Sequence, residues 1–78
     1  MSTEKREKEH QERVRIGNQL REAMEAARLT AGDVAERTGL RAATVRNIIA
    51  GRFNVPLDIL ARVADVLGCE LNIKSKEL

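Results

Sequence analysis

Apolar residues recur every three or four positions from Ile16 to Ala27, which is the spacing of one face of an α-helix. Gly17 lies inside this pattern, where glycine costs about 1 kcal/mol relative to alanine. Close packing of the helix against another backbone would account for a glycine at this position. The pattern therefore predicts a first helix that begins near Val14, is approached closely at Gly17 and ends near Leu29.

Two shorter helices are predicted next. Thr30 precedes Asp33 by three residues, which is the spacing of a capping box at a helix N-terminus. The short helix that follows is broken at Gly39, a residue that can adopt the left-handed conformation of a tight turn. A third helix is expected from about Arg41 to Ala50, and Gly51 ends it.

A fourth helix is predicted after Pro56, and apolar residues fill most of its circumference from Leu57 to Leu67. Such a wide apolar arc belongs to a central helix or to one that a second chain covers. Residues 69–74 alternate between apolar and polar, which is typical of a β-strand. A lone strand recruits another strand, so we expect it to pair with its copy across a two-fold axis. The candidates for the dimer interface are Ile59, Val63, Val66, Leu71 and Ile73.

Residues 1–13 contain no large apolar side chain after Met1, and their basic residues are balanced by glutamates. We expect a charged tail that is frayed or weakly helical. The alternative is a stable extension of the first helix that touches a partner. The expected organisation is thus a tail over residues 1–13, a helical domain over 14–68, and a strand and tail over 69–78.

Composition narrows the classes of function. Phe53 is the single aromatic residue, which argues against a surface that stacks RNA bases. The single cysteine, Cys69, and the single histidine, His10, are far apart, so neither a metal cluster nor a Cys–His nucleophile is expected. No apolar run is long enough for a membrane helix. The charged N-terminal residues lead us to expect no signal peptide, and the lone thiol leads us to expect a reducing compartment such as the cytoplasm. The chain of 78 residues is therefore expected to be a small cytoplasmic binding module without enzyme activity, cofactor or small-molecule ligand.

Arginines dominate the middle of the chain, where no acid lies between Glu36 and Asp58. The guanidinium group forms bidentate hydrogen bonds to phosphate oxygens and to the edge of guanine, so this stretch favours DNA as a partner. A solvated helix face is the alternative interpretation. The arginines concerned are Arg37, Arg41, Arg46 and Arg52.

The spacing of the second and third helices predicts a helix-turn-helix. This motif needs a small residue where its helices touch, a glycine in the turn, and apolar residues where the second helix packs back. The chain supplies these at Val34, Ala35, Gly39, Leu40, Val45 and Ile48.

Residues 16–68 resemble the lambda-repressor/Cro-type helix-turn-helix family, also called the XRE family, through the segments IGNQLREAMEAARLT, GDVAERTGL, RAATVRNIIAG and VPLDILARVADVLG. The resemblance implies an all-α bundle of four or five helices that binds near-palindromic operator DNA as a dimer and represses transcription. The ending LGCELNIK is similar to small antitoxins of this family, which implies a toxin protein as a further partner. The alternative is an adaptor with the same fold and no affinity for DNA, because the family's usual glutamine at the start of the second helix is replaced by Ala31.

In this family the third helix enters the major groove, and the resemblance assigns the site residues accordingly. Candidates for contacts to base edges are Arg41, Ala42, Ala43, Arg46 and Asn47. Candidates for phosphate contacts are Thr30, Ala31, Arg37, Thr44, Arg52 and Asn54. The family often pairs an arginine of the first helix with a glutamate of the third helix. Here the arginine is present as Arg21, but the position of the glutamate is occupied by Ile49. We therefore expect Arg21 to pair with Glu25, one helical turn further on.

Overall fold

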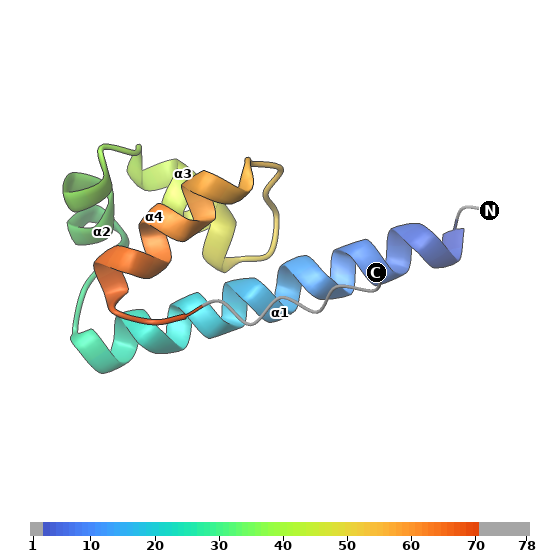
Figure 1. Ribbon diagram of the computed structural model, residues 1–78, viewed down its shortest axis with the longest axis horizontal. Coiled ribbons are helices and arrows are strands. Elements are labelled where there is room, and N and C mark those ends of the chain that lie inside the picture. Colours follow the sequence, from blue (N-terminus) through green and yellow to red (C-terminus); the bar gives the residue numbers. More distant parts are fainter. Residues whose placement is uncertain (1–2, 71–78) are drawn as a thin grey trace.

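The computed structural model describes residues 3–70, and it describes side chains from residue 6 onward. The backbone forms four helices: α1 (Thr3–Ala27), α2 (Ala31–Thr38), α3 (Ala42–Ile49) and α4 (Leu57–Leu67) (Figure 1). The predicted all-α class is confirmed over this part of the chain. The predicted C-terminal strand is not supported, because its first two residues, 69 and 70, are in no strand; the rest of it, with Leu71 and Ile73, lies outside the described residues.

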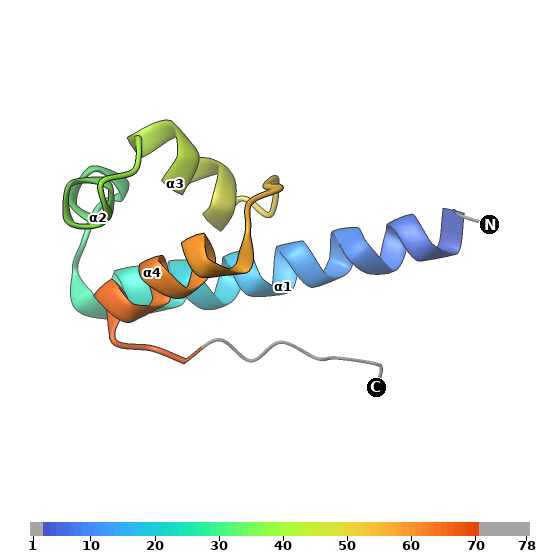
Figure 2. The ribbon, with the colours of Figure 1, turned by 45° about the horizontal axis from the view of Figure 1, so that its top comes forward.

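The three shorter helices pack over the C-terminal half of α1, while the N-terminal half of α1 projects beyond them (Figures 1 and 2). Residues 3–13 thus continue the first helix, and the side chains of residues 6–11 are exposed. Among the described residues, no helix combines the length and the apolar character needed to span a membrane. The buried hydrophobic core draws on all four helices and consists of Ile16, Leu20, Met24, Val34, Ala35, Val45, Ile48, Leu60, Val63 and Ala64.

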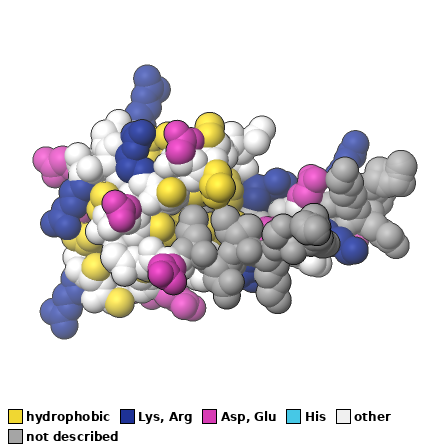
Figure 3. All heavy atoms as spheres, viewed as in Figure 1, with side chains coloured by type: hydrophobic (Ala, Val, Ile, Leu, Met, Phe, Trp, Pro, Cys, Tyr) yellow, Lys and Arg dark blue, Asp and Glu magenta, His cyan; other side chains and the backbone are white. Residues whose placement is uncertain are grey.

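One predicted interface residue on α4 belongs to this core instead. Val63 has an exposed fraction of 0%, so it offers no surface to a second chain, and its assignment to the dimer interface is wrong. Its side chain lies on the stripe of α4 that faces the other helices. Ile59 and Val66 lie on one flank of that stripe and are half-buried, and Leu57 is 62% exposed on the other flank. Figure 3 shows hydrophobic side chains interspersed with polar and charged ones on the side of the molecule that carries α4.

The backbones of α1 and the end of α3 touch directly. A Cβ atom added to Gly17 would lie 2.6 Å from the carbonyl oxygen of Ile48 and 2.9 Å from that of Ile49. The contact continues at Gly51, which has a φ of +76° and where an added Cβ would lie 2.8 Å from the Cα of Val14. The close backbone approach that the sequence predicted at Gly17 is therefore confirmed.

Arg21 strengthens the same crossing with bonds that differ from the prediction. Its guanidinium donates to the Oδ1 of Asn18 at 2.7 Å and to the carbonyl oxygen of Ile49 at 3.4 Å, so the predicted pairing with Glu25 is wrong. The last carbonyl groups of a helix have no partner inside that helix, which leaves the Ile49 oxygen available to a donor. A main-chain oxygen is therefore the acceptor for Arg21, in place of the acidic side chain that the family resemblance led us to look for.

α1 ends in a Schellman motif whose left-handed position holds an arginine. The amide of Leu29 donates to the carbonyl oxygen of Met24 at 3.0 Å, and that of Arg28 donates to Glu25 at 3.1 Å. Arg28 has a φ of 58°, and it is the one residue other than glycine with a positive φ in the described chain. Glycine is the usual residue at this position, because a Cβ atom is strained in the left-handed region.

Replacing Gly17 with alanine should lower the free energy of unfolding by about 1–3 kcal/mol, because the new methyl group overlaps two backbone carbonyls of α3. Urea denaturation followed by circular dichroism measures the change. Gly32→Ala is the matched control, since its Cβ would lie no closer than 3.7 Å to the nearest atom, the Oγ1 of Thr30. Equal stabilities of the two variants would contradict the close crossing.

Arg28→Gly and Arg28→Ala remove the same charge, but only glycine relieves the left-handed backbone. The glycine variant should be the more stable of the two by about 1 kcal/mol. Thermal unfolding of both variants under identical conditions tests this. An alanine variant as stable as the glycine variant would show that residue 28 leaves the left-handed region without cost.

Candidate nucleic-acid interface

The turn between α2 and α3 has the geometry of a helix-turn-helix. Gly39 caps α2 with a φ of +78°, and its amide donates to the carbonyl oxygen of Ala35 at 2.9 Å. Val34 and Ala35 on α2 and Val45 and Ile48 on α3 are buried against each other and against the rest of the core. The position of α3 relative to α2 is therefore determined by packing on both sides of a short turn.

Thr38 is the last residue of α2 and directly precedes the glycine of this turn. Its side chain is buried, and its hydroxyl donates to the carbonyl oxygen of Val34 at 2.7 Å and accepts from the amide of Leu40 at 3.3 Å. The carbonyl oxygen of Thr38 accepts a further bond from the Arg62 guanidinium at 3.3 Å. Because its polar atoms have partners, the threonine is tolerated in the core. Arg62 thus connects α4 to the turn.

The exposed face of α3 collects most of the predicted base-contacting residues. Ala43, Arg46 and Asn47 are exposed on this face, and Arg41 is exposed at its N-terminal cap. The Arg46 and Asn47 side chains form no hydrogen bond or ion pair with other described residues, so their donors and acceptors are free for a ligand. Ala42 differs from the other candidates, because it is half-buried and packs against the core.

Three predicted phosphate contacts lie at the margins of this face. Arg37 is exposed in the last turn of α2, and Arg52 and Asn54 are exposed in the segment between α3 and α4. Thr44 is half-buried on α3. The cations at positions 37, 41, 46 and 52 therefore lie on α3 and on the segments just before and after it, and no acidic residue follows Glu36 until Asp58.

The N-terminus of α2 forms the predicted capping box. The Thr30 hydroxyl accepts from the amide of Asp33 at 3.1 Å, and the Asp33 carboxylate accepts from the amide of Thr30 at 2.9 Å. The hydrogen bond from the Thr30 amide to the carboxylate is the main cause that lowers the pKa of the Asp33 carboxyl group. The Thr30 side chain is thus occupied by the cap. The amides of Ala31 and Gly32 have no hydrogen-bond acceptor among the described residues, so they are the groups at this end that can receive a phosphate oxygen.

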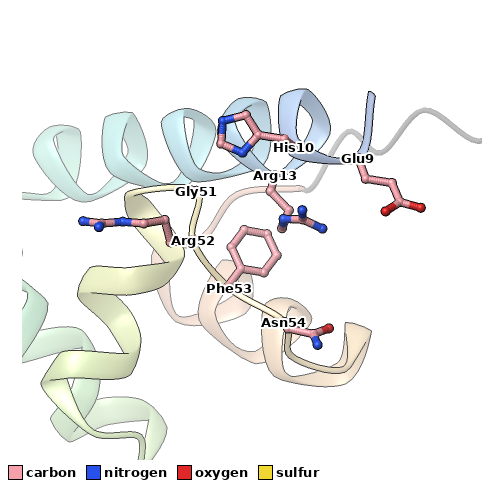
Figure 4. Close-up of a pocket in the computed structure, with 7 residues that line it drawn as sticks. All are labelled: Glu9, His10, Arg13, Gly51, Arg52, Phe53 and Asn54. Carbon is pink, nitrogen blue, oxygen red and sulfur yellow. The ribbon is translucent and has the colours of Figure 1, made fainter. Parts of the chain in front are cut away.

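A concavity of about 580 Å³ lies next to the predicted phosphate contacts, between α1 and the segment that follows α3 (Figure 4). Its lining includes Arg52 and Asn54, which the sequence singled out, and three polar residues of α1, which it did not. Those three residues are Glu9, His10 and Arg13, and Gly51 and Phe53 complete the lining. The sequence could not place α1 here, because its apolar pattern begins only at Val14.

Comparison with known proteins agrees with this geometry. A family model described as a helix-turn-helix domain matches residues 15–72, which include α2, α3, α4 and half of α1. No curated protein matches the chain, and no solved structure matches it. The match favours a DNA-binding regulator over the adaptor that the sequence left open.

Proposed function

Because this chain belongs to the helix-turn-helix domain family, we propose that it is a sequence-specific DNA-binding protein that represses transcription. The observation that carries the proposal is the exposed face of α3, where Arg46 and Asn47 have no partner in the described chain. Val45 and Ile48 anchor the opposite face of the helix in the core. A helix that reads base edges in the major groove needs a fixed position and polar side chains that are free to form hydrogen bonds with the bases.

Each proposed contact follows from the chemistry of the side chain. Asn47 matches the N6 and N7 atoms of adenine, and Arg46 and Arg41 match the O6 and N7 atoms of guanine. Ala43 lets the helix approach closely and can contact a thymine methyl group. Arg37, Arg52, Asn54 and the free amides at the start of α2 are proposed to bind phosphates, which position the protein without reading sequence.

We further infer that the protein binds its operator as a two-fold dimer. The half-buried Ile59 and Val66 on one flank of α4 support this, because a second chain would cover the apolar surface that remains exposed there. A dimer would hold two copies of α3 about 34 Å apart, one turn of DNA, so the operator is expected to be a near-palindrome. The competing proposal is that the C-terminal segment binds a toxin protein instead of a second copy of this chain.

Asn47→Ala should weaken binding to the preferred duplex by about 1–3 kcal/mol and relax the preference at one base pair. Arg52→Ala should weaken all duplexes alike and reduce the salt slope by about one unit. The preferred duplex comes from selection in a randomised library, and fluorescence anisotropy at several salt concentrations measures both effects. Unchanged affinity and preference in Asn47→Ala would contradict the base contact, and a wild type that binds no duplex would refute the DNA-binding proposal.

Val66→Asp should dissociate the dimer at micromolar concentration, since it places a charge in the proposed apolar interface. Sedimentation velocity of the wild type and the variant measures this directly. Leu57→Asp is the matched control on the opposite flank of α4 and should remain dimeric. A monomeric wild type would refute self-association and favour a different protein partner.

A further inference from the structure

The charged half of α1 is held beside the segment that leaves α3. The backbone contact between Gly51 and Val14 lies between them, and a Cβ on Gly51 would overlap the Cα of Val14 at 2.8 Å. Arg52 follows Gly51 directly, and Arg13 precedes Val14 directly. The contact therefore brings two cations from distant parts of the sequence to one rim of the molecule.

Both cations line the same open concavity (Figure 4). Arg13 extends from α1 toward the ring of Phe53, and Asn54 lies on the other side of that ring. Arg52 begins on the same segment below α1, and its side chain points away from the ring. Phe53 is half-buried and packs against the core, so it gives the concavity a fixed floor. The lining is mostly polar, which suits an anion better than an apolar ligand.

Arg13 is available for such a ligand. Arg15, two residues further along α1, forms an ion pair with Glu12. Arg13 and Arg52 form no ion pair with any described residue. Glu9 also lines the concavity, and its negative charge there leaves the two arginines only partly compensated.

We propose that Arg13 binds a DNA backbone phosphate next to the one bound by Arg52, so that α1 contacts DNA in addition to α2 and α3. This inference rests on the proposed function. α3 ends at Ile49, so Arg52 lies just beyond the C-terminal end of the helix that we propose lies in the major groove. A chain that leaves the groove at this end reaches the sugar-phosphate backbone at the edge of the groove, and the concavity lies beside that segment. A continuous DNA strand supplies neighbouring phosphates there, whereas a free anion would supply one.

The test compares the salt dependence of DNA binding in Arg13→Ala and wild-type protein by fluorescence anisotropy. Loss of one phosphate contact should reduce the slope of log affinity against log salt by about 0.9, which corresponds to about eightfold weaker binding at 0.1 M salt. The loss should be equal on the preferred duplex and on an unrelated one. Glu9→Gln should strengthen binding, because it removes the negative charge from the same concavity.

Lys8→Ala is the matched control, since it removes a cation from the same helix outside the lining of the concavity. It should leave the slope unchanged, and circular dichroism should show equal helix content in all three variants. If Arg13→Ala and Lys8→Ala have the same slope while Asn47→Ala still weakens binding, the role of α1 is refuted and the proposed function stands. A wild type that binds no duplex refutes both.

Discussion

The crossing of α1 and α3 at Gly17 is the constraint on which the rest of the structure depends. Two carbonyl oxygens at the end of α3 lie where a side chain on residue 17 would be, so the helices meet at their backbones. Arg21 then binds one of these oxygens, and Gly51 lets the chain turn against Val14. The C-terminal end of α3 is thereby fixed to α1, the longest helix of the described chain.

Much of the fold could be predicted from the sequence, because its local signals agree with one another. The capping box at Thr30, the left-handed Gly39 and the glycine inside the first helix all have the roles that their residue types indicated. The exposed face of α3 followed from the same periodicity, since Val45 and Ile48 define the side that packs inward. These features depend on neighbours within one or two helical turns.

The features that the sequence did not predict depend on contacts between distant segments. Arg21 donates to the carbonyl oxygen of residue 49. Every residue has such an oxygen, so the sequence does not indicate which one accepts the bond. Val63 was assigned to an interface because the apolar arc of α4 is wide, and only its packing shows that it belongs to the core. The concavity near Arg13 exists because α1 continues past the bundle. The residues of α1 before Val14 have no apolar periodicity, so the sequence did not predict a helix there.

The participation of all four helices in one core has a consequence for synthesis on the ribosome. Leu20 on α1 and Val63 on α4 are both fully buried, although more than 40 residues separate them. At about 5–20 residues per second, α1 emerges roughly 2–8 s before α4 can cover it. The N-terminal half of α1 is rich in lysine, arginine and glutamate, and its positive and negative charges balance. These charged side chains keep the nascent chain hydrated during this interval. The core cannot be complete until the fourth helix arrives.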